Sequence, residues 1–257
     1  MENEWKGARG SHMNQRTYST RSLHGQVVHE LGRRIVTGDI GEGVVLPNET
    51  ELGASFDVSR TALREGIKVL TAKGLLASRT RTGTRVRPRS EWNMLDPDIL
   101  AWRLNSDDQQ IEKFIQDLVE FRQAIEPLAA SLAAERATDE QIAEIEQAYE
   151  AMVEAGDDVD AAVEPDLRFH HAILQASGNE LLAPLGALIE TALTASFRMV
   201  SPAFQFDVLA VHKAVLDTIK ARDSRGAWKA MFNLLDHAIT FNKAILAEMR
   251  KAQHTNA

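Results

Sequence analysis

Apolar residues recur every three to four positions along most of this 257-residue chain, the spacing of a helix with one buried face. From residue 98 onward the pattern predicts a succession of helices, over 98–105, 109–136, 139–155, 159–176, 180–199, 203–222 and 224–252. Thr138 and Asn179 are start signals for two of them, and Gly156 and Gly178 are stop signals for two others. The second part of the chain is therefore expected to be an all-helical bundle.

The first part of the chain combines helical and strand-like spacing. SLHGQVVHELGRRIVTGDI predicts a helix that ends near Gly38, and NETE after Pro47 predicts the capped start of a short helix. Ser59 can cap a third helix that ends near Gly74, and two short strand-like segments follow around Gly83. Helix, helix, turn, helix and hairpin is the order of a winged helix-turn-helix. The expected fold is mainly α: this winged domain followed by the helical bundle.

Composition narrows the class of protein. A hydrophobic content of 44% is ample for a buried core, and the absence of cysteine excludes disulfides and thiolate metal sites. No apolar run approaches the roughly 18 residues of a membrane span, and no signal peptide is visible. We therefore expect a soluble, cytoplasmic protein that does not act in a membrane.

Charge divides the chain in two. Residues 13–90 contain 13 Lys/Arg against 7 Asp/Glu, and the remainder to residue 257 contains 14 against 28, although the whole chain has a net charge of −8. This asymmetry indicates a module that faces nucleic acid and an acidic module with another task. The segment MENEWKGARGSH resembles an expression-tag remnant and is not expected to belong to the fold. The predicted organisation is a tag remnant (1–12), a DNA-binding domain (13–88), a linker (89–97), an effector-binding helical domain (98–252) and a tail (253–257).

The predicted third helix has two different sides. SFDVSRTALREGIKVL places Arg60, Thr61 and Arg64 on one side and Leu63 and Ile67 on another. Such arginines often form a solvated face, but here a basic hairpin follows, and the N-terminal residues of this helix are those that enter a major groove. Double-stranded operator DNA is the expected partner. Because one short helix reads few bases, we expect a homodimer on a pseudo-palindromic site.

Histidines on the predicted bundle indicate a metal site. Asp166 and His170 are one turn apart, His212 lies on an apolar seam, and His237 is expected to face the core, whereas His171 points about 100° away from His170. A lone histidine on an apolar face is more often a satisfied core residue, and an Asp/His pair is often a surface pair. However, burying the four inward groups unpaired would cost several kcal/mol. A divalent metal removes that cost: Zn²⁺ is the first expectation, and Mn²⁺, Ni²⁺ or Fe²⁺ also suit these ligands.

Two sets of motifs resemble a known family. LPNETELGASFDVSRTALREGIKVLTAKGLL followed by TRTGTRV resembles the winged-helix domain of GntR-family transcriptional regulators. DLVEFRQAIEPLAASLAAERA, DLRFHHAIL and VHKAVLDTI resemble the FCD ligand-sensing domain of the FadR subfamily. The linker EWNMLDPDILAW is most similar to regulators of sugar-acid catabolism. One departure is Thr50, where family members commonly carry an arginine, so the resemblance does not carry over the phosphate or base contact of that arginine.

The resemblance implies roles for particular residues. The expected DNA-contacting residues are Ser59, Arg60, Thr61, Arg64, Arg81 and Gly83. The expected metal ligands are Asp166, His170, His212 and His237. Arg122 matches an arginine that projects into the effector cavity, and Arg198 is a second candidate for its lining.

These expectations favour a metabolite-responsive repressor, released from DNA by a small carboxylate that binds at the metal. A metal-dependent hydrolase tethered to DNA is the alternative, since an Asp/His₃ site with open positions can activate water. No Glu or His beside the site can be assigned as its general base, so an enzyme is not expected. A structural zinc protein would instead need a closed site with four ligands and no cavity.

Overall fold

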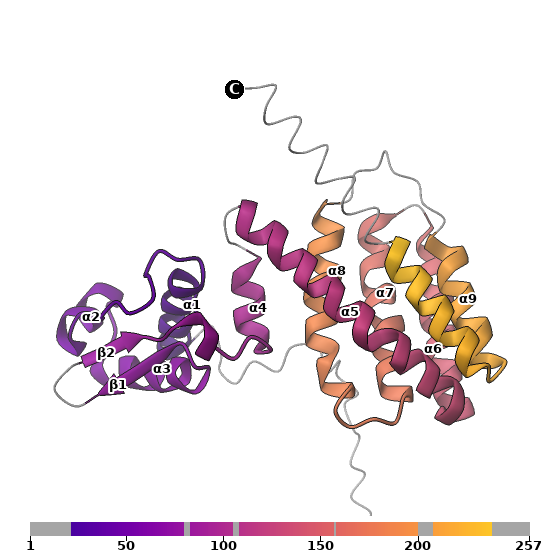
Figure 1. Cartoon of the computed structure of the whole chain (residues 1–257). Helices are drawn as coiled ribbons and strands as arrows, with labels where there is room; N and C mark the ends of the chain where they lie inside the picture. Colours follow the sequence, from indigo (N-terminus) through magenta and orange to yellow (C-terminus); the bar gives the residue numbers. More distant parts are fainter. Residues whose placement is uncertain (1–21, 80–82, 105–107, 157, 200–207, 238–257) are drawn as a thin grey trace, which may run out of the picture. The chain divides into compact units, whose positions relative to one another are not determined.

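The structure, a computed structural model, describes residues 22–79, 83–104, 108–156, 158–199 and 208–237. They fall into two compact units, the first ending at Asp98 and the second beginning at Ile99 (Figure 1). The predicted tag remnant, the tail at 253–257 and Arg81 lie outside the described residues, as do residues 238–252 of the last predicted helix.

The first unit has the predicted order of elements. They are α1 (Leu23–Val36), α2 (Glu49–Phe56), α3 (Arg60–Ala72), β1 (Leu76–Arg79), β2 (Gly83–Val86) and the 3₁₀ turn η1 (Arg89–Glu91). The two strands form an antiparallel pair in which Leu76 lies opposite Val86. Within the part of the chain that the structure describes, this pair is the whole of the β-sheet, so the fold is mainly α.

Local chemistry explains where the helices of this unit begin. Asn48 and Glu51 form a capping box at the start of α2, and the side chain of Ser59 accepts a hydrogen bond from the amide of Ala62 at the start of α3. Helices α1 and α3 cross closely at Gly66, where an added Cβ would lie 2.9 Å from Cγ1 of Val27. The buried face of α3 is thereby fixed against α1, and its polar face is left exposed.

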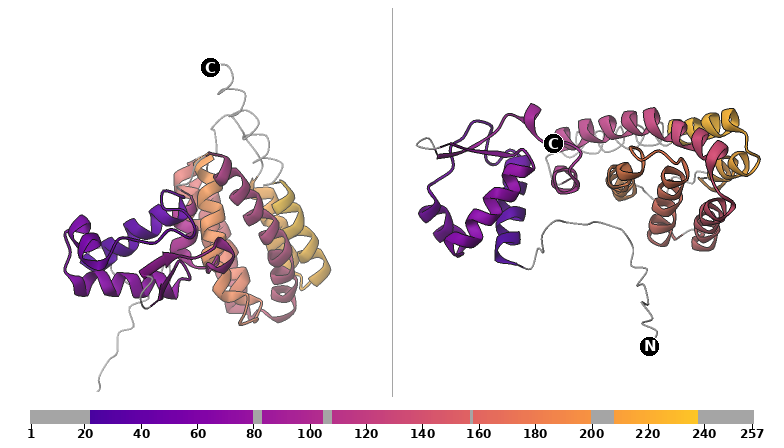
Figure 2. Two further views of the ribbon diagram at one scale, coloured as in Figure 1. Left: turned by 60° about the vertical axis from the view of Figure 1, so that its left-hand side comes forward. Right: turned by 90° about the horizontal axis from the view of Figure 1, so that it is seen from below.

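The second unit is a helical bundle, and the helix α4 (Pro97–Arg103) leads into it. Its helices are α5 (Asp108–Arg136), α6 (Asp139–Ala155), α7 (Val159–Ala176), α8 (Gly186–Met199), α9 (Val208–Lys220) and a last helical segment over residues 224–237. Helix α7 packs against α5, α6 and α8, while α9 packs against α5 and α6. Figures 1 and 2 show α5 running across the other helices of the bundle.

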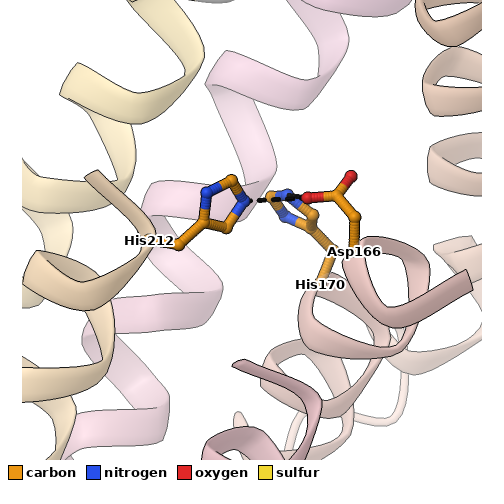
Figure 3. A group of neighbouring side chains, drawn as sticks. All are labelled: Asp166, His170 and His212. Carbon is orange, nitrogen blue, oxygen red and sulfur yellow. Dashed lines mark ion pairs between the residues drawn. The ribbon is translucent and has the colours of Figure 1, made fainter. Parts of the chain in front are cut away.

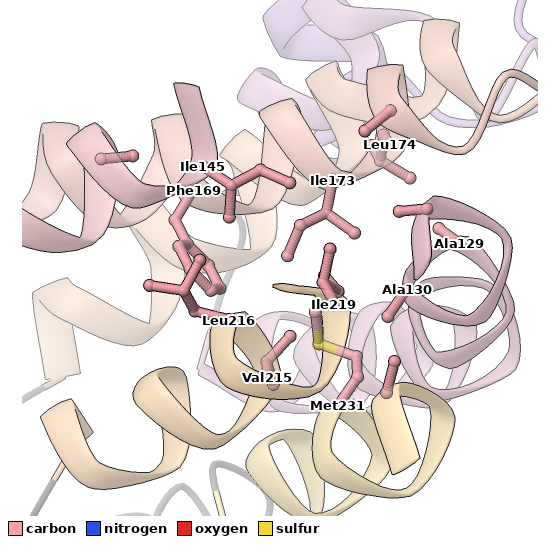
Figure 4. Close-up of a cluster of buried hydrophobic side chains, with 14 of the residues drawn as sticks. Ala129, Ala130, Ile145, Phe169, Ile173, Leu174, Val215, Leu216, Ile219 and Met231 are labelled. Atoms are coloured by element: carbon pink, nitrogen blue, oxygen red, sulfur yellow. The ribbon is translucent and has the colours of Figure 1, made fainter. Parts of the chain in front are cut away.

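Branched, aromatic and small side chains share the core of the bundle (Figure 4). Phe169 and Ile173 on α7 meet Ile145 on α6 and Val215 on α9, and all four are at most 1% exposed. Helix α5 contributes mainly small residues, Ala129, Ala130, Ala133 and Ala134 among them. Alanine keeps the contact surface of a helix flat, so α5 can lie close to its neighbours.

One predicted helix begins later than expected. The pattern predicts a helix over 180–199, but α8 begins at Gly186, after a 3₁₀ turn at Ala183–Leu185. Pro184, inside that turn, has no amide hydrogen to donate and restricts the residue before it, which explains why regular helix starts only beyond it. No helix of the described residues combines the length and apolar character needed to cross a membrane.

Candidate functional site

Three buried side chains from α7 and α9 meet inside the bundle (Figure 3). Asp166 and His170 lie one turn apart on α7, and His212 points at them from α9. Nε2 of His212 lies 2.9 Å and Nε2 of His170 lies 3.8 Å from Oδ1 of Asp166. One potential ligand atom from each residue falls within 4.8 Å of the other two, which is the arrangement of a shared metal site.

The surroundings of Asp166 keep it ionised. Burial by itself raises the pKa of its carboxyl, but the contact with His212 and the charges of His170, His212 and Arg122 outweigh burial and lower the pKa below its ordinary value. The ring of Phe169 stands edge-on to His212, with ring centroids 5.1 Å apart. A carboxylate and two imidazoles held together in an apolar core are therefore available as ligands.

A second layer of buried charge lies on α5. Nδ1 of His170 lies 2.6 Å from Oε2 of Glu126, and Glu126 also forms an ion pair with Arg122. A terminal nitrogen of Arg122 lies 3.4 Å from Nε2 of His170. Burial raises the pKa of Glu126, but the charges of Arg122 and His170 outweigh it and lower the pKa to about 2. Glu126 is not expected from the sequence, because its only signal there is its i,i+4 spacing from Arg122.

The donor set fits a divalent cation. The group contains two buried carboxylates, those of Asp166 and Glu126, beside the single permanent positive charge of Arg122, which leaves one negative charge for a protonated imidazole or a bound cation to balance. A cation held by Asp166, His170 and His212 would balance it, and one carboxylate and two imidazoles suit Zn²⁺ and its neighbours. Glu126 stands behind His170, where a carboxylate orients a ligating imidazole.

The other predicted residues of the bundle lie elsewhere. His237, at the end of the described residues, is exposed and falls outside the group of three, so the expectation that it faces the core is wrong. The buried positions of its helix are Ala227, Met231, Leu234 and Leu235, and His237 falls to the side of the face they define. His171 is exposed, as expected for a residue outside the site. Arg198 belongs to the part of α8 whose side chains lie outside the described residues.

The predicted DNA-contacting residues of the first unit lie at the start of α3 and in the hairpin. Arg60, Thr61 and Arg64 are all exposed, while Leu63 and Ile67 are buried. Ser59 is the N-cap of α3, so its hydroxyl serves the helix itself. Gly83 has a φ of 81°, a conformation that strongly favours glycine, and it is the first residue of β2. The exposed start of α3 and the hairpin form a candidate nucleic-acid interface.

Comparison with known proteins decides the family. The model for bacterial regulatory proteins of the gntR family matches residues 23–86, and the FCD domain model matches residues 117–237. The galactonate operon transcriptional repressor of Escherichia coli (strain K12) is 36% identical over 213 residues, covering 82% of this chain and 92% of that protein. This chain belongs to the GntR family.

A further relative supports the assignment as a regulator, and a solved structure supports the fold. The HTH-type transcriptional repressor NanR of Klebsiella aerogenes is 30% identical over 227 residues, which cover 86% of each chain. The solved structure of Lar from Listeria monocytogenes has a TM-score of 0.59 at 16% identity, over 88% of this chain and 99% of that one, and supports the fold. This GntR protein is therefore a transcriptional regulator that binds operator DNA, and its relatives are regulators rather than enzymes.

Proposed function

We propose that this GntR-family regulator is a homodimeric repressor that a small carboxylate, of the sugar-acid class, releases from a pseudo-palindromic operator. The observation that carries the proposal is the buried group Asp166, His170 and His212 inside the matched FCD domain. The name of the galactonate operon repressor, a relative over most of its length, supports a sugar acid as the class of effector. Arg60, Thr61 and Arg64 are the proposed reading residues, with Arg81 and Gly83 in the wing.

A divalent ion, with Zn²⁺ as the first choice, would be held by Asp166, His170 and His212, and His237 is proposed as the fourth ligand on the resemblance alone. When bound, the ion would accept carboxylate or hydroxyl oxygens of the effector at its open positions. His237 would have to approach the group for this role, because its side chain is exposed in the structure.

Arg122 is the proposed second anchor of the effector. A planar guanidinium pairs with a carboxylate through two hydrogen bonds, and Arg122 already pairs in this way with Glu126. An effector carboxylate would therefore bind Arg122 together with Glu126 or in place of it. Binding of the effector would then change the buried ion pair between Arg122 and Glu126. Arg198 is the second proposed lining residue.

The switch requires the effector to bind one arrangement of the protein more tightly than another. A coupling free energy of about 1–3 kcal/mol between effector and operator binding would be ordinary for such a regulator. We propose that the arrangement favoured by the effector is the one unable to bind DNA.

A two-stage experiment tests this function. A thermal-shift screen of small sugar acids and hydroxy acids, with and without a chelator, would first identify ligands. The active compounds would then be added to the protein bound to its selected operator duplex, and release would be followed by fluorescence anisotropy. We expect one sugar acid to raise the melting temperature only in the presence of metal and to release the DNA. Ligand binding that persists after chelation would contradict the role of the metal, and tighter DNA binding would contradict repression relieved by the ligand.

A further inference from the structure

The two arginines proposed to read DNA are held by a neighbouring helix. Nε of Arg64 donates a hydrogen bond to Oε2 of Glu49, at 2.8 Å, and a terminal nitrogen of Arg60 donates to Oγ1 of Thr50, at 3.2 Å. Arg60 and Arg64 are one turn apart on α3, and Glu49 and Thr50 are consecutive residues in the first turn of α2. Each arginine therefore has its own hydrogen-bond acceptor on α2.

Glu49 and Thr50 belong to a turn whose backbone is fixed by hydrogen bonds. Oδ1 of Asn48 accepts from the amides of Thr50 and Glu51, at 3.0 Å each, and the carboxylate of Glu51 accepts from the amide of Asn48 at 3.3 Å. This capping box fixes the first turn of α2 in the absence of DNA. An arginine side chain that is already oriented loses less conformational freedom when it binds a base edge.

Glu49 lies in the first turn of α2, where a carboxylate suits the helix dipole, but it also lies beside the proposed DNA-binding surface. A carboxylate close to a DNA-binding surface repels phosphate, and an exposed ion pair adds little to the free energy of unfolding. The side chains of Arg64 and Glu49 are 64% and 41% exposed, so this pair is not a core contact. The contact uses Nε of Arg64 and leaves the terminal edge of the guanidinium for a base. That edge offers paired donors to O6 and N7 of guanine.

We infer that Glu49 and Thr50 are positioning residues that set operator specificity, because they aim Arg64 and Arg60 at base edges. This inference rests on the proposed function, in which the two arginines contact DNA. It assigns α2 a part in choosing the sequence, in addition to any contact with phosphate. Glu49 acts through Arg64, and Thr50 acts through Arg60.

Two substitutions in α2 with a matched control test the inference. Glu49→Ala removes the acceptor of Arg64, and Thr50→Val removes the acceptor of Arg60. Glu51→Gln removes the same charge as Glu49→Ala from the same turn, yet keeps the capping box, because glutamine serves at that position. The full-length protein and each variant would select duplexes from a randomised library, and affinity for the selected and a scrambled duplex would be measured at several salt concentrations. Melting temperatures would confirm that each variant is folded.

We expect Glu51→Gln to bind both duplexes somewhat more tightly, with its selected sequence unchanged. Glu49→Ala should bind the scrambled duplex as Glu51→Gln does, but lose about tenfold in discrimination at one guanine position, the size of one base contact. Thr50→Val should lose discrimination at a different position. If Glu49→Ala and Thr50→Val both select the wild-type sequence with wild-type discrimination, the inference is wrong.

Arg64→Ala separates this failure from that of the proposed function. If Arg64→Ala loses discrimination and Glu49→Ala does not, the arginine reads DNA without help from α2, and only the inference about Glu49 fails. If Arg64→Ala also keeps full discrimination, the assignment of Arg64 as a base contact fails, and the inference about Glu49 fails with it.

Discussion

Nε2 of His212 on α9 lies 2.9 Å from Oδ1 of Asp166 on α7, and both side chains are buried. The two helices are therefore joined by buried polar groups inside the bundle. Such a contact is retained in a core when its members are paired or ligate a metal.

The purified protein is expected to contain about one divalent ion per chain, because Asp166, His170 and His212 offer three ligand atoms to one ion. Chelation should lower the melting temperature, since an ion that binds only the folded protein stabilises it by mass action. His212→Ala should lose the ion, measured by elemental analysis, whereas His171→Ala, an exposed neighbour of His170, should keep it. A metal-free protein whose melting temperature ignores chelator would disprove the site.

His237→Ala is expected to weaken metal binding by at least tenfold if His237 completes the ligand set. His237 is exposed, so its side chain would have to turn toward the buried group to bind the ion. Competition with a chromophoric chelator would give the affinity, with His171→Ala as the reference variant. An affinity equal to that of the reference would limit the protein ligands to the three residues of the buried group.

Arg122→Ala should destabilise the protein by about 3–5 kcal/mol, because it leaves the carboxylate of Glu126 buried without its guanidinium partner. The double variant Arg122→Met/Glu126→Leu removes both charges and should recover much of that loss. Urea unfolding would measure the free energies. In the folded double variant, DNA binding should persist while release by the effector is lost; release at the wild-type effector concentration would exclude Arg122 as an anchor.

Gly66→Ala is expected to cost about 1–3 kcal/mol of stability, since its Cβ would meet Cγ1 of Val27 at 2.9 Å and force α1 and α3 apart. Gly53→Ala, where the nearest atom to the new Cβ is the carbonyl oxygen of Val58 at 3.4 Å, is the matched control and should be neutral or stabilising. Thermal unfolding of both variants measures the difference. Equal melting temperatures would show that the crossing of α1 and α3 has room for a methyl group.

Arg60→Ala and Arg64→Ala should each weaken binding to the selected operator by about 1–3 kcal/mol if they make paired contacts with bases. Binding to a scrambled duplex should change much less. A loss that is equal on all duplexes would instead assign these arginines to phosphate. Operator binding that is unchanged in the double variant would refute the assignment of α3 as the reading helix.

Much of this architecture follows from periodicity. The spacing of Leu63, Ile67 and Leu70 predicts both the burial of one face of α3 and the exposure of its arginines. Likewise, the i,i+4 spacing of Asp166 and His170 and the apolar neighbours of His212 predict the buried polar group. In these cases the pattern within one helix determines the outcome, because the neighbouring helices only have to cover the apolar side.

The remaining features depend on contacts between helices. An Arg/Glu pair at i,i+4 is usually an exposed pair, so spacing does not predict that Arg122 and Glu126 are 3% and 2% exposed. The family resemblance points to Arg122 alone, and no other signal in the sequence points to Glu126. Whether His237 faces the core depends on how the last helix is rotated against the rest of the bundle. The spacing of His237 from Asn233 and Phe241 along the sequence does not determine this rotation.

The pairing of Glu49 with Arg64 and of Thr50 with Arg60 has a consequence for engineering. The exposed face of α3 does not support the core, so its residues can be exchanged without loss of folding. Transfer of α3 alone into a relative would nevertheless transfer only part of the operator specificity, because the first turn of α2 would remain that of the relative. Transfer of the complete specificity requires the whole segment from Asn48 to Arg64.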